Sequence, residues 1–182
     1  MADPQLVFDN AVEGMFIHAL HDRMTPRLKA QLRDLGIDLD KKLRPGYERE
    51  TWAAALDLTT RELFPGQSVD EAARQLGVRV TSGYDRTLMG KALLHAAKML
   101  GPKRTLVRLT RSMRASNTYV SATLVERGPT DFEVQCTGLD LSPWFMAGIL
   151  EAALEHCEAK KINMSIESAV GDQATLRVSW AA

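Results

Sequence analysis

The sequence predicts an α+β fold in which helices come first and a four-stranded antiparallel sheet follows. Apolar residues recur at helical spacing through residues 1–115, whereas later segments alternate between apolar and polar residues, as half-buried strands do. One helical segment interrupts the strands and gives the order β-β-α-β-β. Because helices and strands are segregated, α+β is favoured over a parallel α/β fold. The 182 residues suit a single domain, with a mainly helical part (1–115) and a sheet part (116–182).

Two helices are expected near the N-terminus. The first is "NAVEGMFIHAL", and the residues on one of its faces are Val12, Met15, Phe16 and either Ala19 or Leu20. In the second, "TPRLKAQLRDLG", Thr25 can cap the free amides, Pro26 suits the first helical position and Gly36 ends the helix.

Four more helices are expected before the sheet, over 47–64, 68–77, 83–100 and 103–115. The second of these begins with a capping box of Ser68 and Glu71, and Gly77 is expected to end it. The apolar positions that the other three turn inward are Trp52, Ala55 or Leu56, Leu63, Leu88, Leu93 or Ala92, Ala96, Leu100, Leu106, Leu109 and Met113.

The strands are expected as two hairpins. "YVSATLVERG" and "DFEVQCTGL" flank the turn "RGPTD", and "INMSIES" and "TLRVSW" flank the turn "AVGDQA". In the second strand Phe132, Val134 and Cys136 face the same way. Between the hairpins lies a helix that Ser142 and Pro143 open.

Composition excludes several classes of protein. Hydrophobic residues make up 45% and charged residues 25%, as in an ordinary globular protein. The formal net charge of +0, from 23 basic and 23 acidic residues, argues against a general nucleic-acid binder. No apolar run reaches the roughly 20 residues that span a bilayer, and no secretion signal is recognisable. With two cysteines in the chain, we expect a cytoplasmic protein without a disulfide framework.

The adjacent pair His156 and Cys157 in "LEHCEAKK" raises the question of a catalytic thiol. Side chains of neighbouring residues on a helix diverge by about 100°, whereas a thiolate–imidazole pair needs hydrogen-bond contact. Cys157 continues the apolar stripe of its helix and is interpreted as a core residue, and a histidine in the last turn is favoured by the helix dipole. We therefore expect no enzyme, although a catalytic role for either residue is kept as a minor alternative.

Metal and cofactor motifs are absent from the sequence. The four histidines, His18, His21, His95 and His156, show no HxxxH or HExxH spacing, and the pair His18 and His21 alone is too small a ligand set for zinc. There is no GxGxxG motif, no P-loop and no GxSxG motif. We expect neither a metal nor a cofactor.

Two surfaces are candidates for binding. Arg104, Arg108, Arg111 and Arg114 form a basic stripe, which is either an ordinary solvated helix face or a site for an anion or an acidic partner. The eight methionines are either core filler or the lining of an apolar pocket. The predicted pocket residues are Met15, His95, Met99, Met113, Tyr119 and Trp144.

Two resemblances support this interpretation. "EGMFIHAL", "LRDLGIDLDKKLRPGYERETW" and "ELFPG" resemble a large family of uncharacterised myxobacterial paralogues, through the spacing LRxLGxDLxxxLxPxYxxxxW. The C-terminal stretch from "SPWFMAGIL" to "TLRVSW" resembles the ligand-binding fold of vinyl-reductase-type domains, transport-particle subunits and haem–nitric-oxide sensors. That resemblance implies a binding role, often in a dimer. The haem sensors use a helix histidine and a Tyr-x-Ser-x-Arg motif, but "YVSAT" has Thr123 in place of the arginine.

The leading hypothesis is a non-enzymatic regulatory or sensory domain that binds a small apolar or amphiphilic ligand between helices and sheet. The alternative is a protein–protein interaction module that forms a homodimer or docks on a partner through the basic helix face or a sheet edge.

Overall fold

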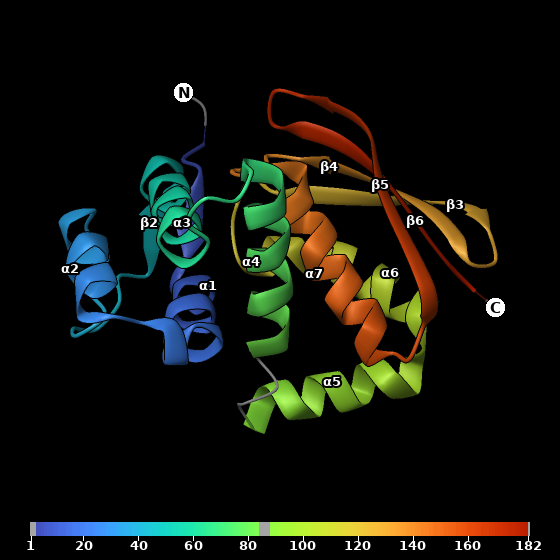
Figure 1. Cartoon of the computed structure of the whole chain (residues 1–182), viewed down its shortest axis with the longest axis horizontal. Helices are drawn as coiled ribbons and strands as arrows, with labels where there is room; N and C mark the ends of the chain where they lie inside the picture. The colour runs from blue at the N-terminus through green and yellow to red at the C-terminus, as the bar shows by residue number, and fades with distance from the viewer. Residues whose placement is uncertain (1–2, 84–87, 182) are drawn as a thin grey trace.

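The computed structural model describes residues 3–83 and 88–181, without the side chains of 88–90 and 92–94. Helices of the N-terminal half form one side of the molecule, two long helices cross its middle, and an antiparallel sheet covers the other side (Figure 1). This arrangement confirms the predicted α+β class. No helix in the described part of the chain is both long and apolar enough to cross a membrane.

The N-terminal half consists of short elements around one apolar cluster. Strand β1 (Leu6–Phe8) leads into α1 (Asp9–Val12), a π-helix η1 (Glu13–Ala19) and a 3-10 turn η2 (His21–Arg23). Helices α2 (Pro26–Asp34) and α3 (Arg49–Leu63) follow, with strand β2 (Gly46–Glu48) before α3. All five apolar residues predicted to share a face of the first helix are buried: Val12, Met15, Phe16, Ala19 and Leu20.

The predicted cap and stop of α2 are confirmed. The Thr25 hydroxyl accepts a hydrogen bond from the Leu28 amide at 3.1 Å, and Gly36 ends the segment with a φ of +95°. The helix predicted over 47–64 is wrong in its first residues, because Tyr47 lies in β2 and pairs with Val7 of β1. Three-residue strands are too short to show an alternating pattern, so this pair could not be recognised.

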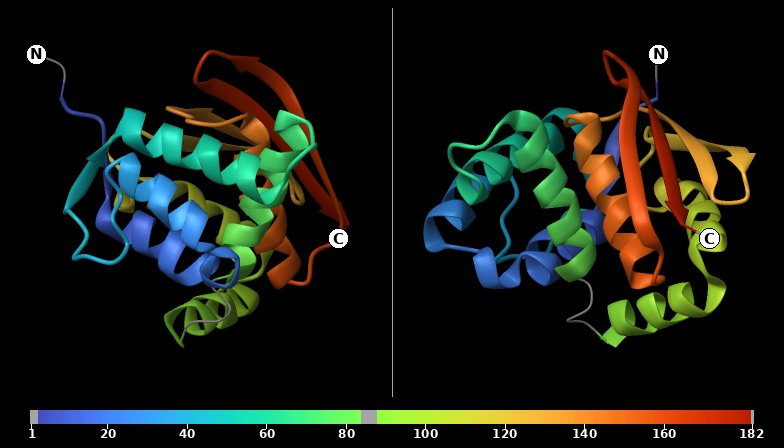
Figure 2. Two further views of the ribbon diagram at one scale, coloured as in Figure 1. Left: turned by 60° about the vertical axis from the view of Figure 1, so that its left-hand side comes forward. Right: turned by 45° about the vertical axis from the view of Figure 1, so that its right-hand side comes forward.

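Two long helices, α4 (Val69–Gly83) and α7 (Pro143–His156), lie against each other at the centre of the molecule (Figure 2). The predicted helix end at Gly77 is wrong, since α4 continues to Gly83. A Cβ atom on Gly77 would lie 2.1 Å from the Phe145 carbonyl oxygen, so this glycine permits close helix packing and does not end the helix.

Helices α5 (Leu88–Leu100) and α6 (Pro102–Ser112), with the 3-10 turn η4 (Met113–Ala115), connect the centre to the sheet. The predicted start of α5 at Gly83 is wrong, because Gly83 is the last residue of α4. Leu106 is fully buried on α6, and Leu109 and Met113 are half-buried beside it, as predicted. The side chains of Leu88, Ala92 and Leu93 lie outside the described residues.

The sheet contains the four predicted strands, β3 (Ser121–Gly128), β4 (Asp131–Thr137), β5 (Lys160–Val170) and β6 (Gln173–Ala181). Their order is β3-β4-β6-β5 and every neighbouring pair is antiparallel. Bulges interrupt the two outer strands, once in β3 and twice in β5. Phe132, Val134 and Cys136 are buried on one face of the sheet, as the alternation predicted.

The core has two parts. One cluster lies among the N-terminal helices, where Phe16 and Trp52 meet edge to face at 5.9 Å between ring centroids. The other lies between the sheet, α6 and α7. Strand β1 of the first part is hydrogen-bonded to the segment that leads into β3. The Phe8 amide donates to the Ser116 carbonyl oxygen, and the Thr118 amide donates to the Leu6 carbonyl oxygen, both at 2.9 Å.

Candidate binding cavity

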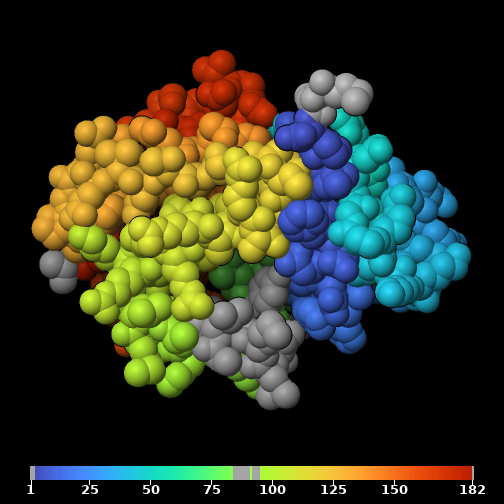
Figure 3. Space-filling view, turned by 180° about the vertical axis from the view of Figure 1, so that it is seen from behind, coloured from blue at the N-terminus to red at the C-terminus, as the bar shows by residue number. Residues whose placement is uncertain are grey.

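A cavity of about 580 Å³ lies between the two parts of the core. It is lined by residues of β1, α1, η1, α3, the ends of α4 and α5, α6, one face of α7, and the 113–120 and 139–142 segments. Seen from behind, the molecule is hollowed between the α1–η1 segment, the 113–120 segment and α6 (Figure 3). Atoms of α4 are visible at the floor of this hollow. The hollow therefore opens where segments distant in sequence meet.

Most of the cavity wall is apolar. Large side chains from five elements contribute to it, including Met15, Trp52, Leu109, Met113, Phe145 and Met146. Three of these six are methionines, whose flexible thioether side chains adapt to irregular apolar shapes. A concave, largely apolar site of this size is typical of small-molecule binding.

The polar end of the cavity contains Tyr119 and Asp140. The Tyr119 hydroxyl donates to Asp140 Oδ2 at 2.5 Å, and Arg49 Nε donates to Asp140 Oδ1 at 2.7 Å. Arg49 also donates to Asp172 Oδ2 and to the Leu139 carbonyl oxygen, both at 3.1 Å, and its guanidinium lies over the Tyr119 ring. Asp140 therefore has a charged partner and a neutral donor, which compensates the burial of its carboxylate.

Burial dominates the electrostatics at this end. It raises the pKa of Asp140, although Tyr119 and Arg49 both donate to the carboxylate and favour its ionised form. Burial also raises the pKa of Tyr119, and the hydrogen bond to Asp140 acts in the same direction. The phenol is therefore neutral at physiological pH and serves as a hydrogen-bond donor.

The structure brings together three of the six predicted pocket residues. Met15, Met113 and Tyr119 line the cavity. Trp144 is half-buried beside the second core cluster and does not line it. His95 and Met99 are exposed on α5, and Met99 retains 79% of its accessible surface. Whether any of the six binds a ligand stays a prediction.

The four arginines of the basic stripe are exposed, but they differ in position. Arg108 lines the cavity, whereas Arg104 and Arg111 do not. Arg114 donates to the Thr118 carbonyl oxygen at 3.2 Å. Within the described residues, Arg104, Arg108 and Arg111 form no ion pair.

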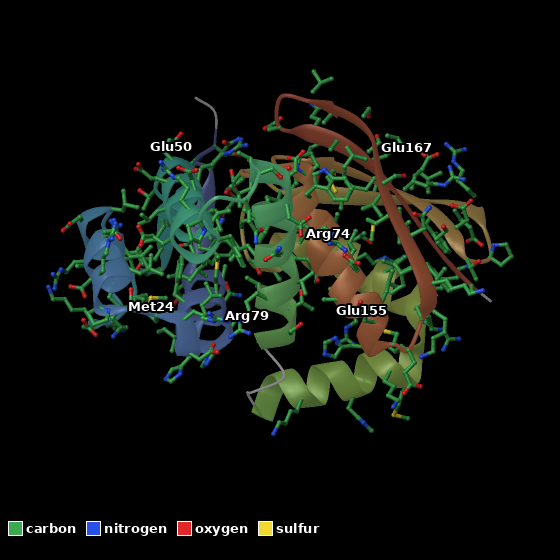
Figure 4. The ribbon with its side chains drawn as sticks, in the orientation of Figure 1. Met24, Glu50, Arg74, Arg79, Glu155 and Glu167 are labelled. Atoms are coloured by element: carbon green, nitrogen blue, oxygen red, sulfur yellow. The ribbon has the colours of Figure 1, made fainter. Side chains whose placement is uncertain are left out.

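A second hollow of about 610 Å³ lies beside α4 and α7 and is lined mainly by polar side chains. Figure 4 shows Arg74 and Arg79 projecting from α4, and Glu155 from α7, in this region. Arg74 forms an ion pair with Glu151 at 2.6 Å, and Arg79 pairs with Asp22. Because much of its charge is neutralised within the chain, this hollow is the weaker candidate.

His156 and Cys157 have separate partners. The Cys157 thiol donates to Thr105 Oγ1 at 3.3 Å, and His156 Nδ1 lies 2.7 Å from the Ala152 carbonyl oxygen. Burial raises the pKa of the other cysteine, Cys136, to about 12. In residues 3–83 and 88–181 no group of three or more potential metal-ligating side chains is found.

Comparison with known protein families identifies a match over residues 5–181, to a family described as "Protein of unknown function (DUF2378)". The chain belongs to the DUF2378 family. No curated protein matches this DUF2378 chain.

The DUF2378 chain is similar in fold to solved H-NOX domains. An oxygen-binding H-NOX domain related to soluble guanylate cyclases is 13% identical, with a TM-score of 0.63 and 96% of each chain covered. A mutant H-NOX protein from K. algicida in the Fe(II) unliganded form is 13% identical, with a TM-score of 0.62, covering 94% of this chain and 95% of its own. An H-NOX mutant from T. tengcongensis is 13% identical, with a TM-score of 0.55 and coverage of 85% and 87%. The predicted fold resemblance to haem–nitric-oxide sensors is confirmed.

Sequence reasoning missed Arg49 and Asp140 of this DUF2378 protein. Arg49 falls inside the spacing motif that predicted the resemblance to myxobacterial paralogues, and Asp140 lies in "LDLSP", between a strand and a helix, where polar site residues often gather. Their separation of 91 residues hides the contact from any local pattern.

Proposed function

We propose that this protein is a non-enzymatic sensory or regulatory domain that binds a small apolar or amphiphilic molecule in the cavity between η1, α6 and α7. The cavity itself carries the proposal, because about 580 Å³ lies within the roughly 300–1,000 Å³ of typical ligand pockets. The likeness to an oxygen-binding H-NOX domain supports a ligand-binding role at the level of the fold.

Haem does not fit the residues of this cavity. Two of the solved neighbours were studied for the distortion of their haem. None of the four histidines and neither of the two cysteines of this chain lines the cavity. The Tyr119 hydroxyl already donates to Asp140, and Thr123 stands where the sensor motif has arginine. We therefore propose an organic ligand that needs no iron ligation.

The absence of catalysis is part of the proposal. Neither His156 nor Cys157 lines the cavity, and each has a hydrogen-bond partner elsewhere. Replacing Cys157 by Ala is expected to leave ligand binding intact. An enzymatic activity that is present in the wild type and lost in a folded Cys157→Ala variant would contradict a purely binding role.

Binding is tested by filling the cavity. The fluorescent probe N-phenyl-1-naphthylamine is titrated into the wild type, Met113→Trp and Met99→Trp, with folding checked by circular dichroism. Met113 lines the cavity, whereas Met99 is exposed and does not. Met113→Trp is expected to weaken probe binding at least ten-fold, and Met99→Trp to leave it unchanged. Equal affinities for all three proteins would contradict the cavity as the site. Native mass spectrometry of protein from its own source is expected to show a retained small molecule.

A second candidate function is docking through the basic face of α6. It is favoured because Arg104 and Arg111 are exposed and, among the described residues, form no ion pair. The double change Arg104→Glu/Arg111→Glu should abolish self-association of the protein or its association with an acidic partner. Light scattering after size-exclusion chromatography measures both. Unchanged association would remove this candidate.

A further inference from the structure

We infer that the cavity ligand carries an anionic head group, a carboxylate or a phosphate, and that Arg108 binds this head group at the rim. This inference rests on the proposed function, since it names the chemical class of the molecule that the cavity takes.

Two charged side chains, Asp140 and Arg108, occur among the described residues that line the cavity. Asp140 is compensated inside the protein, because Arg49 and Tyr119 donate to its two oxygens at 2.7 and 2.5 Å and its side chain is 5% exposed. Arg108 is exposed and has no ion-pair partner in the described part of the chain. The charge left for a ligand is therefore positive.

The neutral polar groups of the wall are largely occupied as well. The hydroxyls of Thr81, Thr105, Ser112 and Ser142 each donate to an acceptor within the protein. Asn117 accepts from the amides of residues 119 and 120 through its side-chain oxygen and donates to the Met113 carbonyl. An uncharged polar ligand would find few free partners here, whereas an anion would find one strong partner.

The position of Arg108 on α6 distinguishes it from the other arginines. Successive residues of an α-helix are about 100° apart, so Thr105, Leu109 and Ser112 project toward a common side. These three residues line the cavity, and Arg108 lies at the edge of the same face. Arg104 and Arg111 lie farther around the helix and do not line it. The side chain of Arg108 can thus reach the opening of the cavity, while those of Arg104 and Arg111 face solvent.

The chemistry of the two regions defines the ligand. The Arg108 guanidinium can bind a carboxylate or a phosphate through two parallel hydrogen bonds, whereas it would repel a cationic head group. The methionine-rich wall behind it takes an apolar body. A single-chain anionic amphiphile meets both requirements.

The experiment compares head groups on one chain length. Dodecanoate, dodecyl phosphate and dodecanol are titrated, below their critical micelle concentrations, into the wild type, Arg108→Gln and Arg104→Gln by isothermal calorimetry. Arg104→Gln is the matched control, because Arg104 is also exposed on α6 but does not line the cavity. Arg108→Gln is expected to weaken binding of an anionic probe about ten-fold or more. Dodecanol binding should change less than two-fold, and Arg104→Gln should resemble the wild type.

The outcomes separate this inference from the proposed function. If Arg108→Gln binds dodecanoate and dodecyl phosphate as tightly as the wild type does, the role of Arg108 is overturned while the cavity stays a binding site. Equal weakening by Arg104→Gln would also overturn it, because a general surface charge would then explain the effect. If no probe, dodecanol included, binds the wild type, the proposed function itself fails. A preference of the wild type for either anionic probe over dodecanol, lost in Arg108→Gln, supports the inference and identifies the head group.

Discussion

Gly77 and Gly148 lie at the contact between the two central helices. A Cβ atom at Gly77 would be 2.1 Å from the Phe145 carbonyl oxygen, and one at Gly148 would be 2.1 Å from the Arg74 carbonyl oxygen. Both obstacles are backbone atoms of a packed helix, which cannot rotate away as a side-chain tip can. Each glycine therefore fixes how closely α4 and α7 approach.

Gly77→Ala and Gly148→Ala are each expected to lower the free energy of unfolding by about 2 kcal/mol or more. Overpacking a core typically costs about 1–3 kcal/mol, and the gain of about 1 kcal/mol in helix propensity offsets only part of a clash with backbone. Gly128→Ala is the control, because a Cβ there meets its nearest atom at an ordinary 3.6 Å. Urea denaturation followed by circular dichroism measures the difference. A loss equal to that of the control would contradict a steric role for the helix glycines.

At the scale of elements, an ion-pair network joins β4 to its neighbours. Arg177 of β6 donates to both oxygens of Asp131, at 2.5 and 2.6 Å, and to Glu133 at 3.2 Å. Arg127 of β3 donates to both oxygens of Glu133, at 2.7 and 2.8 Å. The hydrogen bonds from Arg177 lower the pKa of Asp131, and those from Arg127 lower the pKa of Glu133.

The lowered pKa values predict a loss of stability in acid. A carboxylate whose pKa is lower in the folded state stabilises the fold above its unfolded pKa of about 4, and that contribution disappears as pH falls through the folded pKa. Stability should therefore decrease below about pH 4, and Arg177→Gln should make the decrease shallower between pH 5 and 2. Arg61→Gln, at an exposed pair on α3, should keep the wild-type slope. Thermal unfolding across this pH range measures both, and identical slopes for all three proteins would refute the network's role.

At the scale of the whole molecule, Arg49 connects the N-terminal helices to the sheet side. It begins α3, yet its partners Asp140 and Asp172 lie 91 and 123 residues away. The side chains of Arg49 and Asp140 are 20% and 5% exposed. A pair this deeply placed is costly to break from one side, because the remaining charge loses its compensation.

Arg49→Gln is expected to lower the free energy of unfolding by about 2–4 kcal/mol, since removal of one partner strands the buried Asp140 carboxylate. Arg61→Gln removes an exposed pair and should cost less than about 1 kcal/mol. The double change Arg49→Gln/Asp140→Asn should recover part of the loss in urea denaturation. An equal loss of unfolding free energy for Arg49→Gln and Arg61→Gln would show that the contact between Arg49 and Asp140 is not energetically important.

Sequence patterns predicted those features that depend on neighbours along the chain. The buried face of residues 12–20, the Thr25 cap and the alternation of Phe132, Val134 and Cys136 all follow from local spacing. Gly77 was misjudged because its reason for being glycine lies on another helix. In the cavity, Met15, Met113 and Tyr119 were predicted. Asp140, and Arg49, which donates to it without lining the cavity, were missed because only the folded chain joins them.

The bulges in the outer strands have a consequence for self-association. The sheet ends at β3 and β5, whose unpaired backbone groups would normally invite another strand to add on. Extra residues interrupt β3 near Arg127 and β5 at two places, so neither edge presents a long, regular ladder of donors and acceptors. Continuous sheets across two copies and fibrillar aggregation through these edges are therefore disfavoured. We therefore expect a partner to be recognised by side chains on the helices of this protein, and not by strand addition at these edges.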